Sequence, residues 1–146
     1  MRLRTGVVGL ATVAFVGVVL CQYPLLAQSS KTIWDGVYSE AQAKRGEGTY
    51  NQSCASCHGT SLEGGEMAPP LTGNDFNANW DTLSLGQLIE RIRTTMPQEN
   101  PGSLSRQQNV DVVAYLLQKG KFPAGSAELP TQTDALNGIG FKAQKP

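Results

Sequence analysis

Two cysteines and the only histidine of the chain fall within five consecutive residues, Cys54-Ala55-Ser56-Cys57-His58. Positions i, i+3 and i+4 lie on one side of a helical turn, so both thiols and the imidazole can address the same flat ligand. This is the spacing for covalent attachment of a c-type haem. The pattern therefore predicts one haem c, held by thioethers from Cys54 and Cys57, with the His58 imidazole on the iron.

Other uses of this cluster fit the rest of the chain less well. A structural zinc site takes four ligands, and beyond residue 27 the sequence offers two cysteines and one histidine. A thioredoxin-like pair lies near a βαβ pattern, which this sequence lacks. The remaining alternative is a plain disulfide next to an accidental histidine. The disulfide is disfavoured for three reasons. The five residues match the haem-attachment motif, the N-terminus has the pattern of an export signal, and the sequence offers too little apolar core to be stable without a cofactor.

The first 27 residues have the organisation of a secretory signal peptide. Two arginines precede an apolar run, and Ala27 is a small residue at a suitable cleavage position. The uncharged stretch 5–30 is also long enough for an uncleaved membrane anchor, which needs about 18 or more residues. A lipoprotein signal ending at Cys21 fits poorly, because a bulky leucine precedes it. We expect a periplasmic protein, or one anchored to the membrane and facing the periplasm.

The charge of the chain narrows the class of partner. Twelve basic and twelve acidic residues give a formal net charge of zero, whereas nucleic-acid proteins carry a basic excess. Cleavage after Ala27 would remove two arginines and leave 119 residues with a net charge of −2. We therefore expect no nucleic-acid partner, no strong electrostatic steering, and a membrane contact only if the N-terminal segment stays attached.

Three helices are predicted, each opened by a serine with a glutamine three residues later, which is a capping box. The serines are Ser39, Ser84 and Ser105. The middle helix has apolar residues at i, i+3, i+4 and i+7, the spacing of an amphipathic helix. Residues 59–79 are rich in glycine, proline and asparagine and are expected to form a loop. The pattern predicts an all-α fold.

Three or four short helices joined by long loops bury little apolar surface. Small domains of this kind usually need a disulfide, a structural metal or a cofactor to be stable. This shortage supports a bound haem. We divide the chain into a signal peptide 1–27, an N-terminal extension 28–38, a haem domain 39–120 and a C-terminal extension 121–146. The last segment is either a disordered end or docked, and its apolar residues favour docking: Leu129, Leu136, Ile139 and Phe141.

The second iron ligand is sought among the methionines, because a single histidine excludes bis-histidine ligation within one chain. Met96 precedes a proline and lies 38 residues beyond His58, which is ample chain to pass round the haem edge. Met67 lies only nine residues on. Met96 is favoured over Met67 and over an open sixth site; either methionine could instead pack in a core. A haem histidine donates its other ring N–H to a carbonyl, which Pro69 or Pro70 could offer.

Several of these features together resemble a class I cytochrome c over about residues 39–120: the helix with Gly46 and Tyr50, the Cys54–His58 site, the Pro-Pro-Leu-Thr-Gly loop 69–73, Met96-Pro97 and the final helix with Tyr115. The resemblance implies the class I cytochrome c fold, with three to four short helices round one haem and the first and last helices crossing. Gly46 and Tyr50 would then lie against Ala114 and Tyr115. It also implies that the Pro69 carbonyl accepts from His58 and that Met96 is the distal ligand.

Three segments, 34–38, 91–97 and 122–130, are similar to small cytochromes associated with quinoprotein (pyrroloquinoline quinone) alcohol dehydrogenases. This narrower resemblance implies a quinoprotein dehydrogenase as electron donor. Trp80 is a further candidate for the site, because its indole N–H would suit a haem propionate; the alternative is a plain core tryptophan. Of Arg91 and Arg93, at most one is expected to meet a propionate, and a solvated helix face is favoured.

Haem held by histidine and methionine has no vacant position on the iron, and methionine raises the potential. No Ser–His or Cys–His nucleophile pair competes with this use of the single histidine. We predict an electron-transfer protein and not an enzyme: a periplasmic monohaem cytochrome that takes electrons from a dehydrogenase towards a terminal oxidase or another cytochrome. It would be a monomer or a weakly held complex subunit. The alternative is a haem-based gas or redox sensor with a labile or open sixth site.

Overall fold

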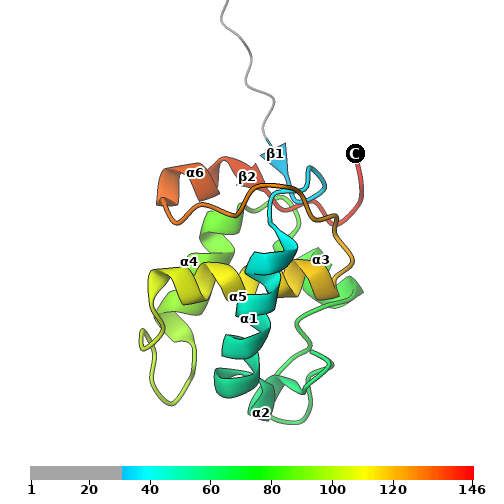
Figure 1. The fold of residues 1–146 in the computed structure, drawn as a ribbon. Helices are drawn as coiled ribbons and strands as arrows, with labels where there is room; N and C mark the ends of the chain where they lie inside the picture. The colour runs from blue at the N-terminus through cyan, green and yellow to red at the C-terminus, as the bar shows by residue number, and fades with distance from the viewer. Residues whose placement is uncertain (1–30) are drawn as a thin grey trace, which may run out of the picture.

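The structure is a computed structural model that describes residues 31–146. The predicted signal peptide and its cleavage site lie outside the described residues. Six helices and two short strands follow one another (Figure 1): β1 (Lys31–Thr32), α1 (Glu40–Ser53), α2 (Ala55–His58), α3 (Asn74–Trp80), α4 (Leu85–Thr95), α5 (Arg106–Lys119), α6 (Thr133–Asn137) and β2 (Ile139–Gly140). Within the described part of the chain, no helix is both long and apolar enough to cross a membrane.

The three predicted helices are present and begin at the predicted serines. The capping boxes at Ser84 and Ser105 are complete. At Ser39 only half of the box forms. Its hydroxyl accepts from the Gln42 backbone N–H at 3.1 Å, but the Gln42 side chain bonds instead to the Leu129 backbone, at 3.1 and 2.8 Å. The buried backbone of Leu129 needs hydrogen-bond partners, and the Gln42 side chain supplies them in place of the predicted bond to Ser39.

The prediction of a continuous loop over residues 59–79 is wrong at its end, where α3 forms. Gly73 precedes this helix with a φ of +87°, a conformation that favours glycine. Asp75 lies in the first turn, where a negative charge suits the helix dipole. These local features favour the start of a helix at this position. The helix has seven residues, which is too short for an amphipathic repeat to show in the sequence. Together with α2 and α6, it raises the helix number above the predicted three or four.

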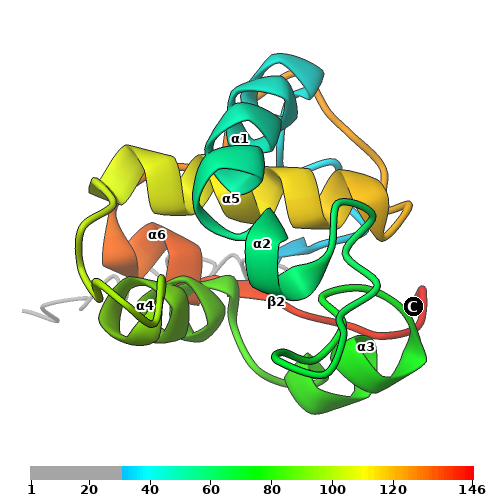
Figure 2. The ribbon, with the colours of Figure 1, turned by 90° about the horizontal axis from the view of Figure 1, so that it is seen from below.

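Helices α1 and α5 cross, as Figures 1 and 2 show from two directions. The crossing is close at Gly46, where a Cβ atom would lie 1.9 Å from the Asp111 carbonyl oxygen. The Tyr50 and Tyr115 rings meet one turn away, with centroids 5.4 Å apart. The predicted contact of Tyr50 with Tyr115 is therefore found, and the atoms nearest to Gly46 belong to Asp111 and Val112.

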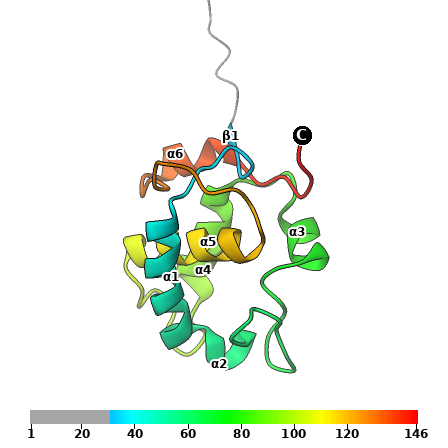
Figure 3. The same cartoon turned by 45° about the vertical axis from the view of Figure 1, so that its right-hand side comes forward.

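The two ends of the described chain meet on the side of the molecule away from α2 (Figures 1 and 3). Strands β1 and β2 pair in parallel, and the Trp34 indole N–H donates to the Lys142 carbonyl at 2.9 Å. The tail docks, as its apolar residues indicated: Phe122, Leu129, Leu136, Ile139 and Phe141 are all buried. The hydrophobic core therefore extends beyond the predicted haem domain into the C-terminal extension.

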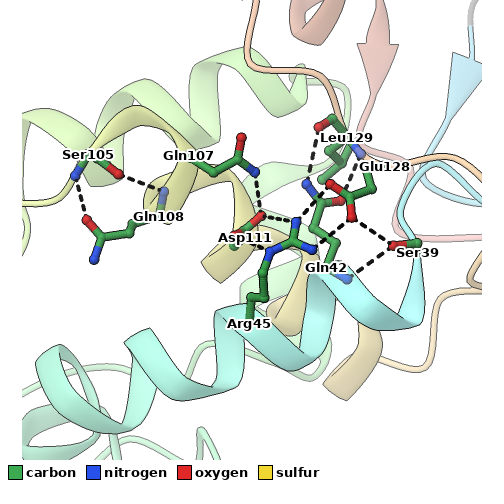
Figure 4. Close-up of polar contacts among 9 residues, drawn as sticks. All are labelled: Ser39, Gln42, Arg45, Ser105, Gln107, Gln108, Asp111, Glu128 and Leu129. Carbon is green, nitrogen blue, oxygen red and sulfur yellow. Dashed lines mark hydrogen bonds and ion pairs between the residues drawn. The ribbon is translucent and has the colours of Figure 1, made fainter.

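One arginine ties this tail to the crossed helices (Figure 4). The Arg45 guanidinium donates to both carboxylate oxygens of Asp111, at 3.0 and 3.2 Å, and to both of Glu128, at 2.9 and 2.8 Å. Asp111 is buried and also accepts from Gln107 at 2.7 Å. Arg45 therefore links α1, α5 and the C-terminal extension in one network.

Replacing Glu128 by glutamine is expected to weaken the dependence of stability on acid pH. The hydrogen bond from Arg45 lowers the pKa of Glu128, so its ionised form is favoured in the folded state. That stabilisation is present above the unfolded pKa of about 4.3 and is lost as pH falls through the lowered folded pKa. The effect will be small, because both partners are nearly half exposed. Urea unfolding at pH 7 and below pH 4 measures it.

Glu66→Gln is the matched control for this experiment, since Glu66 is exposed and no ion pair joins it to any of residues 31–146. Wild type and the control should lose the same stability on acidification, and Glu128→Gln should lose less. An equal loss in all three proteins would contradict the assigned role of the Arg45–Glu128 pair.

Candidate functional site

A cavity of about 500 Å³ opens among α2, α3, α4 and α5. This size is typical of a site for a small molecule or cofactor. The attachment motif forms one part of the wall, and apolar side chains from three other helices form much of the rest: Phe76 and Trp80 of α3, Leu88 and Ile92 of α4, and Val112 and Leu116 of α5. An apolar wall of this kind suits a flat hydrophobic ligand.

The attachment motif lies where α1 ends and α2 begins. Cys54 caps α1 and donates its backbone N–H to the Tyr50 carbonyl at 2.8 Å, and the chain then turns into the short helix that ends at His58. Both thiols line the cavity and are free, so the two cysteines do not form the alternative disulfide. Burial raises the pKa of Cys54 to about 11, which keeps this thiol uncharged at neutral pH.

The His58 ring is fixed by one hydrogen bond. Its Nδ1 lies 2.8 Å from the Pro69 carbonyl oxygen, and the residue is buried. A carbonyl can only accept, so Nδ1 carries the proton, and Nε2 keeps its lone pair for a metal. The structure thus places the Pro69 carbonyl, and not that of Pro70, against the histidine.

Glycine at position 64 shapes the loop that brings Pro69 to the histidine. Gly64 has a φ of +73°, and its N–H donates to the His58 carbonyl at 2.8 Å. A Cβ atom there would lie 2.5 Å from the Pro70 nitrogen. A larger residue would therefore push the proline pair away from the imidazole.

The structure separates the two candidate methionines by exposure. Met96 is the residue that caps the C-terminus of α4, and its backbone N–H donates to the Ile92 carbonyl at 2.8 Å. It is half-buried and lines the cavity. Met67 also borders the cavity, but 82% of its surface is exposed. A thioether that is already partly withdrawn from water is the better placed ligand, and this favours Met96.

Trp80 and one of the two arginines also reach the cavity. Trp80 is half-buried on its wall, with its ring 6.4 Å from that of Phe76. Arg91 lines the same cavity, whereas Arg93 turns away to pair with Glu90 at 2.7 Å. Of the two arginines, Arg91 is therefore the one that lines the cavity. Whether Trp80 or Arg91 binds one stays a prediction.

Sequence reasoning missed most of the cavity wall. Phe76 lies in the segment expected to be a loop, and a lone aromatic residue among glycines and asparagines was the available clue. Val112 and Leu116 face the cavity from a helix that is buried on nearly all sides, so periodicity could not tell which positions line it.

The donor set fits haem c. Two free thiols, an imidazole with its Nε2 available and a half-buried thioether surround one apolar cavity. Cys54 and Cys57 would hold the group by thioethers, and His58 and Met96 would bind its iron, which supplies a one-electron couple. Within residues 31–146 there is no group of three or more histidine, cysteine or acidic residues that could hold a metal ion by themselves.

Comparison with known proteins agrees with this site. Residues 41–116 match a family model described as cytochrome C oxidase, cbb3-type, subunit III. Cytochrome c-551 of Bacillus subtilis (strain 168) is 36% identical over 63 residues, which are 43% of this chain and 54% of that protein. The chain thus spans about half the length of this curated relative.

A solved structure shares the fold. The sulfane dehydrogenase SoxCD from Paracoccus pantotrophus superposes with a TM-score of 0.52 over 86% of this chain and 68% of that chain, at 19% identity. Cytochromes c are electron-transfer proteins, which agrees with the prediction that this chain is not an enzyme. Because the family match covers more than half of the sequence and includes the attachment motif, the chain belongs to the cytochrome c family described as cytochrome C oxidase, cbb3-type, subunit III, and is a c-type cytochrome of the class I fold.

Proposed function

We propose that this protein is a periplasmic monohaem cytochrome that carries single electrons, with His58 and Met96 as the iron ligands. The observation that carries the proposal is the His58 imidazole, fixed to the Pro69 carbonyl at 2.8 Å beside a cavity that also holds both thiols and Met96. Ligands on both faces of the iron would leave no position for a substrate. Such a site exchanges an electron with little rearrangement.

The donor that we propose is a quinoprotein-type dehydrogenase, and the acceptor a terminal oxidase or another cytochrome. The donor rests on the similarity of three segments to cytochromes of that system. Two of them pack together here: the Trp34 and Phe122 rings are 4.8 Å apart, and the Tyr38 hydroxyl donates to the Phe122 carbonyl at 2.8 Å. The acceptor is supported by the family description, which names an oxidase subunit.

An optical redox titration of the exported holoprotein tests the function. We expect a c-type spectrum in the reduced form and a single one-electron midpoint that is clearly positive, because methionine favours ferrous iron. We also expect no spectral change when carbon monoxide is added to the reduced protein. A strongly negative midpoint, a high-spin ferric spectrum or rapid carbon monoxide binding would favour the sensor instead.

N-terminal sequencing of the same preparation tests the location. A mature chain that begins at Gln28 would support cleavage and a periplasmic protein. A chain that keeps residues 1–27 and fractionates with membranes would contradict cleavage, and would support the anchored alternative.

A further inference from the structure

One buried side chain of the C-terminal extension packs against a residue of the cavity wall. Phe141 is completely buried, and its ring centroid lies 6.1 Å from that of Phe76, with the two planes at 75°. Phe76 in turn lines the cavity and lies next to Trp80. Edge-to-face aromatic pairs of this kind stabilise packing beyond the effect of the area that they bury. Phe141 therefore backs the cavity wall without belonging to it.

The backbone of Phe141 also holds the loop that joins two cavity walls. Its N–H donates to the Leu83 carbonyl at 2.7 Å, and its carbonyl accepts from the Thr82 N–H at 3.1 Å. Two residues on, the Ala143 N–H donates to the Asp81 carboxylate at 3.0 Å. Residues 81–83 lie between α3 and α4, which both line the cavity. The tail thus bonds to three successive residues of this loop.

The conformation of this loop needs such support. Thr82 has a φ of +68°, a region that a β-branched residue rarely occupies. Residues in such regions are strained, and this conformation persists where the surrounding structure fixes it. The two bonds between Phe141 and its neighbours in the loop supply that constraint.

We infer that Phe141 is a positioning residue for the haem site: through Phe76 and through the α3–α4 loop, it sets the rear wall of the cavity and keeps water away from the haem. This inference rests on the proposed haem site. It extends the site beyond the family-matched segment, residues 41–116, into a tail that the match does not cover. Burial is one of the levers that set a haem potential, because water stabilises the more positively charged ferric state.

The test compares Phe141→Ala with Leu129→Ala in the full exported holoprotein. Leu129 is an equally buried tail residue, but its backbone is bonded to Gln42 of α1, away from the α3–α4 loop. Both variants should unfold at lower denaturant, because each leaves a cavity. Phe141→Ala should also shift the redox equilibrium about tenfold towards the ferric state, which is about 59 mV for one electron. Leu129→Ala should keep the wild-type midpoint.

The outcomes separate this inference from the proposed function. A wild-type protein without a c-type spectrum would overturn the function itself. With a normal wild type, an unchanged midpoint in Phe141→Ala, or the same shift in both variants, would overturn the role of Phe141. If Phe141→Ala gives no holoprotein, Phe141→Leu decides: a smaller shift in the same direction supports the role, and an unchanged midpoint overturns it.

Discussion

With Met96 as the proposed distal ligand, its replacement by alanine is expected to let carbon monoxide bind to the reduced protein, which the wild type should not do. The same variant should show a high-spin ferric spectrum and a midpoint potential lowered by on the order of 0.1 V or more, within the roughly 0.8 V range that axial ligands span. The reason is that alanine cannot reach the iron, so the sixth position opens and the soft thioether no longer favours the ferrous state. Spectra with and without carbon monoxide, and a redox titration, measure both effects.

Met67→Ala is the matched control, because it removes the same side chain from the border of the same cavity. Met67 is 82% exposed, whereas Met96 is half-buried at the end of α4. The control should therefore keep the wild-type spectrum and midpoint. If Met67→Ala opens the iron and Met96→Ala does not, the assignment of the distal ligand is wrong. If neither variant changes the spectrum, the sixth ligand is not a methionine.

The features that could be predicted from the sequence are those that depend on residues close together in it. The motif at Cys54–His58 needs one helical turn, and the capping boxes at Ser84 and Ser105 need three residues. The amphipathic α4 repeats its apolar positions within eleven residues. In each case the geometry of a single helix determines, from the spacing in the sequence, which side chains lie on the same face or within hydrogen-bond distance.

Apart from α3, the features that were missed depend on contacts between residues that lie far apart in the chain. The Gln42 side chain bonds to Leu129, 87 residues away, and so leaves its predicted capping box. The Phe76–Phe141 contact joins α3 to the tail, and β1 pairs with β2 from the opposite end of the described chain. Strands of two residues have no alternation to detect. Such contacts follow from the packing of the whole domain, which no local pattern records.

Gly46→Ala and Gly48→Ala are expected to change stability in opposite directions, although both place one methyl group on α1. At Gly46 the Cβ atom would lie 1.9 Å from the Asp111 carbonyl oxygen and 2.4 Å from its carbonyl carbon. These are backbone atoms of α5 and cannot rotate away, so the two helices must separate. Overpacking of this kind costs about 1–3 kcal/mol, and more where the backbone must move. It outweighs the roughly 1 kcal/mol that alanine gains over glycine in a helix.

Gly48 lies one residue beyond Glu47 on the exposed side of the same helix, and nothing lies within 4 Å of a Cβ atom built there. Alanine at this position should therefore stabilise the protein by about 0.5–1 kcal/mol, through helix propensity and a less flexible unfolded chain. Both variants gain the same helix propensity, so the difference between their free energies of unfolding measures the steric cost at the α1–α5 crossing. Urea unfolding of the holoproteins shows whether each variant raises or lowers the free energy of unfolding.

The Gly46 variant should also reduce the yield of holoprotein. α1 ends at Ser53 and is capped by Cys54, and α5 supplies Val112 and Leu116 to the cavity wall. A wider crossing therefore moves the attachment cysteine relative to that wall. The ratio of haem absorbance to protein measures this loss, and Gly48→Ala should keep the wild-type ratio. If both variants stabilise the protein and both attach haem normally, then the close approach of α1 to Asp111 does not hold the haem site together.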